Sequence, residues 1–142
     1  MAGLIASAMP NMNTLNASDG TKVAATDAMA DDNWVGFQRV VADGDMFDTT
    51  YKANTVTQVV VKADAITNVA DTFVKLGMYF DGTRLYFYKN GLVLPDSKAI
   101  TTVLGTDFPS DVNLGACVGL FSGDGSDATM TLDWVRAAQA IY

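Results

Sequence analysis

The sequence contains no histidine and no glutamate, and Cys117 is its single cysteine. Without histidine the chain cannot build a Ser-His-Asp or Cys-His nucleophile, or ligate zinc or haem through imidazole. All 16 acidic residues are aspartate, so no glutamate acid/base pair exists either. One cysteine excludes an internal disulfide. No Lys or Arg flanks Cys117 in the run LGACVGLF, so we expect a small buried apolar residue rather than a reactive thiol.

Positive charge is also scarce: 9 Lys and Arg face those 16 aspartates, which gives a net charge of −7. Proteins bind nucleic-acid phosphates mainly through clustered Lys and Arg, so we expect no nucleic-acid partner. No run reaches the roughly 18 apolar residues of a membrane span. The opening MAGLIASAMP lacks the basic start of a secretory signal. We therefore expect synthesis in a cytoplasm and no membrane partner.

What the sequence does contain is 49% hydrophobic residues in 142, enough for one globular domain over 1–142. Short apolar runs separated by Gly, Asp, Asn and Thr predict an all-β antiparallel sandwich or barrel. The clearest piece is 72–91, in which Val74, Leu76, Met78 and Phe80 alternate with Phe73, Lys75, Gly77 and Tyr79. We expect a hairpin there, with Asp81-Gly82 supplying the positive-φ positions of its turn and Asn90-Gly91 forming a second turn.

Other segments show the same pattern more weakly. The expected strands are 3–8, 34–42, 46–52, 55–62, 92–94, 113–121 and 128–138, with 64–71 as a turn or a single helical turn. Pro95 and Pro109 bracket 96–111, which we expect to be a surface loop with one extended piece. Trp134 is expected in the core with Phe87 and Phe121.

Two of these stretches carry a family resemblance. They read K-L-G-x-x-F-D-G followed by F-Y-x-N-G, and L-D-W-V-R-x-A-Q near the C-terminus. Over about 3–139 the chain resembles concanavalin A-like (laminin G-like) jelly-roll domains, most closely the capsid decoration, or cement, proteins of tailed bacteriophages. The resemblance implies two curved antiparallel sheets and no enzyme activity. It also implies a location on the virion, as trimers that lock neighbouring major capsid protein subunits together.

The chain looks short before 3–8 when compared with that family. Missing N-terminal strands would expose a sheet edge and apolar inner surface. We therefore expect obligatory association, either as a homotrimer or in a hetero-assembly in which another virion chain supplies the absent strands. The residues expected at interfaces are Met1, Leu4, Ile5, Tyr79, Tyr86, Tyr88 and Tyr142. Each of them could equally be ordinary sandwich surface.

Three chemical alternatives stay open. Glucan-cutting relatives use two glutamates and an aspartate on one strand, whereas this chain offers only Asp133 there. We expect Asp133 to pair with a basic residue or to accept hydrogen bonds, and we expect no catalysis. Aspartate loops are weak calcium candidates through Asp43, Asp45, Asp124 and Asp127, although the same residues are ordinary turn formers, so no cofactor is expected. A glycan-binding, lectin-like module for host or surface attachment would use Trp34, or Tyr86 and Tyr88, as an aromatic platform.

Overall fold

The computed structural model describes residues 2–5, 33–39, 44–54, 56–95, 98–99, 107–109, 112–119 and 129–138. Within these ranges the chain forms nine β-strands and no helix, which confirms the all-β class. The strands are β1 (Ala2–Ile5), β2 (Trp34–Gln38), β3 (Met46–Lys52), β4 (Val59–Thr67), β5 (Leu76–Phe80), β6 (Arg84–Lys89), β7 (Leu92–Val93), β8 (Lys98–Ala99) and β9 (Gly115–Val118). No helix in these ranges is long and apolar enough to cross a membrane.

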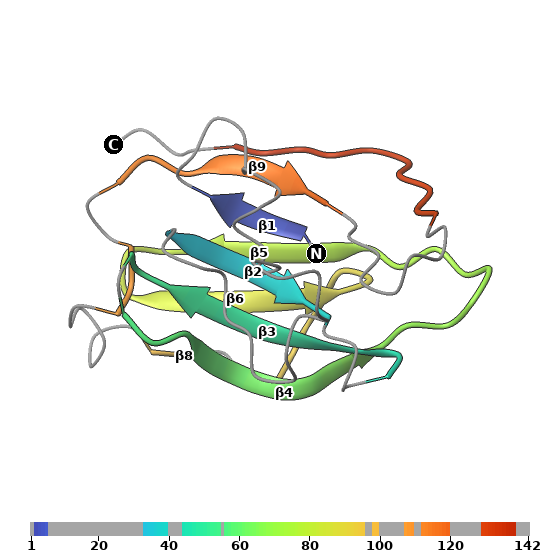
Figure 1. Cartoon of the computed structure of the whole chain (residues 1–142), viewed down its shortest axis with the longest axis horizontal. Coiled ribbons are helices and arrows are strands. Elements are labelled where there is room, and N and C mark those ends of the chain that lie inside the picture. Colours follow the sequence, from blue (N-terminus) through green and yellow to red (C-terminus); the bar gives the residue numbers. More distant parts are fainter. Residues whose placement is uncertain are drawn as a thin grey trace, which may run out of the picture.

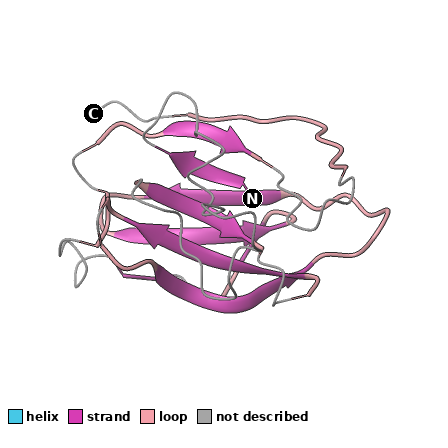
Figure 2. Ribbon diagram, in the orientation of Figure 1, coloured by secondary structure: helices cyan, strands magenta, loops and turns pink. Residues whose placement is uncertain are grey.

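The strands form two antiparallel sheets that overlie each other as a sandwich (Figure 1). The larger sheet has the order β4-β3-β2-β1-β9, and the smaller has the order β5-β6-β7 with β8 also paired to β6. Figure 2 shows that long loops join the strands at the two ends of the sandwich. β1 lies between strands that are distant in the sequence, because residues 2–5 pair with both 34–37 and 115–118.

Aromatic side chains join the two sheets. Phe37 of β2 and Phe87 of β6 meet edge to face, with ring centroids 5.2 Å apart. Phe108 bridges the sheets, 5.5 Å from Tyr51 of β3 and 5.0 Å from Phe80 of β5. Burial of Phe37, Phe87 and Phe108 contributes about 1.5–3 kcal/mol for each side chain. The prediction of a surface loop over 96–111 was therefore wrong at Phe108, which is buried in the core, while β8 confirms the extended piece within that loop.

The β5–β6 hairpin forms as its alternation predicted. Leu85 and Phe87 are buried, while Tyr79 and Tyr86 stack on the outer face. The assignment of the turn needs one correction: Gly82 has φ of +93°, but Asp81 does not lie in the positive-φ region. The Asp81 N–H donates to the Arg84 carbonyl, so the central residues are 82–83, one position later than expected.

The second turn, at Asn90-Gly91, is confirmed. Asn90 has φ of +52° and Gly91 has φ of +83°, and the Lys89–Leu92 pair flanks them. Two consecutive positive φ values are what a two-residue type I′ hairpin turn requires. The turn leads directly into β7, which covers 92–93 of the expected 92–94.

β4 is longer than the sequence suggested and begins later. It runs from Val59 to Thr67, whereas the prediction ended the strand at 62 and began a turn at 64. The strand continues because Ile66 is buried in the core and opposite Phe47 of β3. Asp64 adopts φ of +52° inside the strand, beside register shifts in the β3–β4 pairing. The Asp and Ala content that indicated a turn instead marks an irregularity in a strand.

Two other strands are shorter than expected in the ranges that the structure describes. β2 ends at Gln38, and residues 40–42 of its predicted extent lie outside the described ranges. β9 begins at 115 rather than 113, and residues 120–121 lie outside as well. β1 covers 2–5, so 6–8 also fall outside. The backbone of Cys117 lies in β9, and its expected burial concerns a side chain that is not described.

The last predicted strand is wrong over residues 129–138. These residues carry no strand hydrogen bonds, and every one of them is exposed. Trp134, expected in the core, is 60% exposed. Period-2 alternation identifies a segment able to pair as a strand, but it does not ensure that the segment meets the backbone of a neighbouring strand in register. In Figure 1 this segment runs along the top of the sandwich in the direction opposite to β9.

Candidate functional site

The outer face of the β5–β6 hairpin carries the three tyrosines predicted for an interface. The strand register places Tyr79 opposite Tyr86 and Gly77 opposite Tyr88. The rings of Tyr79 and Tyr86 stack, with centroids 6.1 Å apart and planes 23° apart. Tyr79 is 50% exposed, and Tyr86 and Tyr88 are half-buried. The structure thus brings all three onto one face.

A carboxylate borders this aromatic face. Asp81 accepts hydrogen bonds from the Thr83 hydroxyl and N–H, each 2.8 Å long, and from the Arg84 N–H at 2.7 Å. These bonds lower the pKa of Asp81 to about 2. The pKa of Tyr86 is raised, first by loss of hydration and then by its hydrogen bond to the Asp81 carboxylate. The face therefore presents stacked, uncharged rings beside a fixed negative charge.

The other predicted interface residues lie elsewhere. Leu4 and Ile5 belong to β1, in the interior of the larger sheet, where both backbone edges are already paired. They are thus not on the same sheet as the tyrosines. Met1 and Tyr142 lie outside the described residues.

Trp34 cannot be a glycan platform, because its side chain is fully buried. Its indole N–H donates to the Thr50 hydroxyl over 2.9 Å. Every residue of β2 is buried, so both faces of this strand are covered. A platform at Trp34 would have required one face of β2 to lie in solvent, and the sequence pattern does not show that both faces are covered.

The aspartates proposed as weak calcium ligands receive no support as a group. Asp45 accepts a 2.8 Å hydrogen bond from Arg39, and both side chains are exposed. Asp43, Asp124 and Asp127 lie outside the described residues. Within the described ranges no three acidic or cysteine side chains come together as a metal site. Asp45 therefore acts as an ion-pair partner in the turn before β3.

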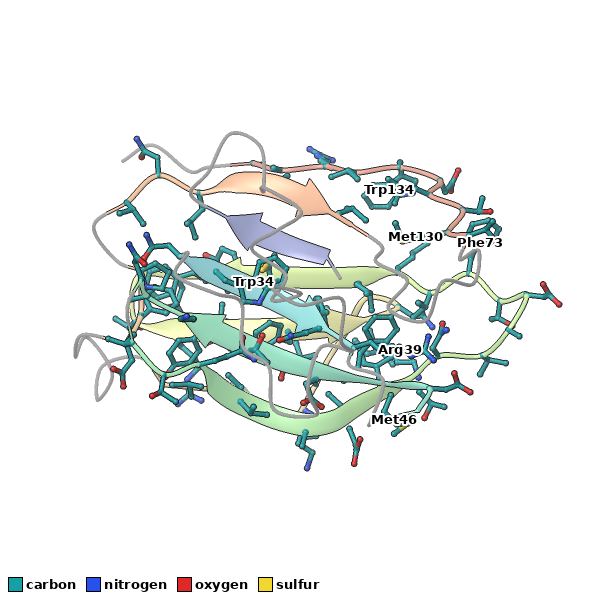
Figure 3. The ribbon with its side chains drawn as sticks, in the orientation of Figure 1. Trp34, Arg39, Met46, Phe73, Met130 and Trp134 are labelled. Atoms are coloured by element: carbon teal, nitrogen blue, oxygen red, sulfur yellow. The ribbon has the colours of Figure 1, made fainter. Side chains whose placement is uncertain are left out.

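Residues 129–138 form a second surface, where the sequence predicted a strand with Trp134 in the core. Met130, Leu132 and Trp134 are exposed, and so is Val135. In Figure 3 Phe73, Met130 and Trp134 lie toward the same end of the molecule, and Phe73 is 70% exposed. The sequence signal was present, since the segment alternates apolar and polar residues, but this alternation predicted a paired strand and not an exposed segment.

Asp133 lies in the middle of this surface and departs from its prediction. No hydrogen bond or ion pair in the described structure involves Asp133 or any other residue of 129–138. The backbone groups of an extended segment without such partners are open to pairing with another strand. Together, the tyrosine face and segment 129–138 are surfaces suited to binding another macromolecule.

Comparison with protein-family models, with curated protein sequences and with solved structures found no match.

Proposed function

We propose that the protein is a non-enzymatic bacteriophage structural protein that decorates and stabilises an icosahedral capsid as a trimer. Two lines support this proposal: the sequence resemblance to phage cement proteins, and an antiparallel sandwich that presents large apolar side chains to solvent. The observation that carries most weight is the exposure of Phe73, Leu92 and Trp134, each at least 60% exposed. Large apolar side chains left this exposed are candidates for contacts with a protein partner.

The proposed mechanism is mechanical. Each copy would bury tyrosine and apolar surface across the junction of two major capsid protein subunits. Tyrosine suits this purpose because it offers a large rigid ring and a polar tip at a low cost in conformational entropy. Many weak contacts in parallel then add up to substantial shell stability through multivalency. The jelly-roll connectivity and the completion of the sandwich by another chain belong to the same proposal.

A shell-binding experiment tests this function. Empty shells assembled from the major capsid protein of the same phage are incubated with the purified chain, sedimented, and melted in a calorimeter. We expect saturable binding at a fixed copy number and a higher shell melting temperature. Replacing both Tyr79 and Tyr86 by Ser should weaken binding about tenfold, since hot-spot aromatics cost at least about 1–2 kcal/mol when truncated. Shells that sediment without the chain at saturating concentration would reject the proposal.

The stacking of Tyr79 and Tyr86 supports a second candidate function, which is glycan binding. Partly exposed, stacked aromatic rings beside a carboxylate can hold a sugar ring by stacking and hydrogen bonding. The same Tyr79/Tyr86 double substitution separates the two functions. Specific binding on a glycan array that the substitution abolishes, together with no binding to shells, would favour the lectin-like module.

A further inference from the structure

Among the residues that the structure describes, two features lack partners and complement each other: the outer edge of β5 and the extended segment 129–138. We propose that segment 129–138 of one copy of this chain binds as an antiparallel strand to the free edge of β5 in a second copy. This inference concerns association of the chain with itself, and it does not depend on binding to a capsid.

The edge of β5 presents unpaired backbone groups. β5 pairs only with β6 in the described structure. The Asn90 N–H donates to the Lys75 carbonyl at one end of this ladder, and the Asp81 N–H donates to the Arg84 carbonyl at the other. Because antiparallel bonding alternates along a strand, residues 75, 77, 79 and 81 bond toward β6. The N–H and C=O groups of Leu76, Met78 and Phe80 therefore point to the free edge.

Within Leu76–Phe80 this edge carries neither the charges nor the bulges that protect sheet edges from pairing. The sequence of β5 is LGMYF, which contains no charged residue and no proline. By contrast β4, at the edge of the larger sheet, exposes Lys62 and Asp64 and is interrupted by register shifts. Charges and bulges of this kind prevent edge-to-edge association. The contrast shows that the β5 edge is open to a further strand, whereas the β4 edge is protected.

Segment 129–138 has the residue pattern of a strand that could pair with the β5 edge. Met130, Leu132 and Trp134 alternate with Thr131, Asp133 and Val135, and all are exposed without hydrogen bonds. One face is thus apolar and suited to a core, and the other is mixed. An apolar face of this length, left in water, is an unfavourable state that pairing would remove.

One antiparallel register matches both faces. On the inner face it places Met130, Leu132 and Trp134 opposite Met78, Leu76 and Val74, which are half-buried at the margin of the core. On the outer face it places Asp133 opposite Lys75, and Thr131 opposite Gly77. A shift by two residues moves Asp133 opposite Gly77 or Phe73 and loses the opposite charge, while a shift by one turns the apolar face outward. The competing edge of β9 offers no basic residue across 112–119.

The direction of the chain indicates that the strand comes from a second copy. In Figure 1, β5 and segment 129–138 run in the same direction, both from right to left. An antiparallel pair with β5 of the same chain would require the segment to reverse. A segment from a neighbouring copy can approach in the opposite direction without any change in its own sandwich. Because donor and acceptor surfaces differ, this contact is head to tail and can close into a ring, such as the proposed trimer.

Disulfide trapping tests the register and the source of the strand together. In a C117A background, one protein carries Gly77→Cys and another carries Thr131→Cys. These positions face each other in a non-hydrogen-bonded pair, where the Cα separation of about 4.5 Å suits a disulfide. A Cβ at Gly77 meets only Tyr88, at 3.5 Å, so the substitution fits. We expect the mixed proteins to form a 77–131 link, identified by peptide mass spectrometry, at a yield at least fivefold above a mixture with Thr129→Cys.

Each outcome decides the question. A 77–131 link between two chains supports the proposal. In a chain carrying both cysteines, a link that forms at monomer mass in dilute solution, with none in the mixture, would show that the segment completes its own sandwich and would overturn it. If the 77–131 link forms neither in the mixture nor in the chain with both cysteines, the proposal is also overturned. A different polypeptide would then be the candidate partner of the β5 edge.

A charge exchange provides a second, independent measurement. Lys75→Asp and Asp133→Lys each place like charges opposite each other. We expect each to weaken self-association about tenfold by sedimentation equilibrium at about 0.15 M sodium chloride, where screening suppresses the effect of the changed net charge. The chain with both substitutions restores opposite charges and should regain association to within about twofold. Both residues are exposed, so circular dichroism should show unchanged folding. Single substitutions without effect, or a double substitution without recovery, would contradict the proposed register.

Discussion

The carboxylate of Asp81 links a local turn to the dependence of stability on pH. Its hydrogen bonds from Thr83 and Arg84 hold the ionised form and lower its pKa from 3.8 to about 2. A depressed pKa in the folded state stabilises the fold at pH values above the unfolded pKa. This contribution is therefore complete above about pH 4 and disappears as the pH falls through 2.

Replacement of this carboxylate should reveal that dependence. We expect Asp81→Asn to lower the melting temperature at pH 7, because the amide binds the turn N–H groups more weakly than a carboxylate. The difference from the unsubstituted chain should shrink below pH 4 and vanish near pH 2. Thermal unfolding followed by circular dichroism between pH 7 and pH 2 measures it. The matched control is Asp71→Asn, at an exposed positive-φ position that asparagine also tolerates. A constant difference at every pH would contradict the assignment.

A second residue-scale prediction concerns the buried bond between Trp34 and Thr50. Thr50→Val would leave the indole N–H without a partner, and Trp34→Phe would leave the hydroxyl without one and open a cavity. Each should destabilise the chain by about 1–3 kcal/mol in urea unfolding. The double variant Trp34→Phe/Thr50→Val should cost less than the sum of the two, since no polar group is left unpaired. Strict additivity would show that this hydrogen bond contributes nothing to stability.

At the scale of elements, sequence reasoning succeeded where all the determinants are local. The β5–β6 hairpin follows from period-2 alternation on both sides of Asp81-Gly82, although its turn lies one residue later than predicted. The Asn90-Gly91 turn after it leads into β7 as predicted. The two inner residues Leu85 and Phe87 are buried as their alternation requires. The stacked pair of Tyr79 and Tyr86 follows from the same register, so this part of the candidate site was predictable.

Prediction failed where a distant element decides the outcome. Phe108, in a loop rich in Pro and Asp, is buried because it fits between Tyr51 and Phe80 from two different sheets. Trp34 is buried because the outer face of β2 is covered, which no local pattern encodes. Segment 129–138 shows the opposite error. Its sequence predicts a paired strand, but it has no strand partner in the described structure. Local periodicity shows whether a segment is able to form a strand with a buried face. Contacts with distant elements decide whether that strand and its burial occur.

The Asn90-Gly91 turn allows a prediction about an element with a matched control. Gly91 has φ of +83°, and a Cβ there would contact nothing within 4 Å. Gly91→Ala therefore adds only backbone strain, and we expect a loss of about 1–2 kcal/mol. Gly77→Ala lies in the middle of β5, without positive φ, and should change stability by less than about 1 kcal/mol or raise it. Urea unfolding of both variants makes the comparison, and equal losses would show that turn geometry is not the cause.

For the whole molecule, the net charge of −7 opposes association of identical copies. Two compact chains of this length lie about 35 Å apart in contact, where such charges repel by roughly 6 kcal/mol in unscreened water. The screening length is about 30 Å at 0.01 M salt and about 8 Å at 0.15 M, so salt removes most of what remains. The proposed Lys75–Asp133 contact is an exposed pair, worth about 0.2–1 kcal/mol at most. Long-range repulsion therefore dominates over the local attraction.

Self-association should accordingly strengthen with salt. We expect the association constant to rise about tenfold between roughly 0.01 M and 0.15 M sodium chloride, equivalent to about 1.4 kcal/mol. Sedimentation equilibrium at several salt concentrations measures this dependence. The chain carrying both Lys75→Asp and Asp133→Lys has the same net charge, so it should show the same slope. A constant that falls as salt is added would mean that attraction between charged groups holds the copies together, because screening weakens attraction as it weakens repulsion. The apolar face of Met130, Leu132 and Trp134 would then not be the main source of binding.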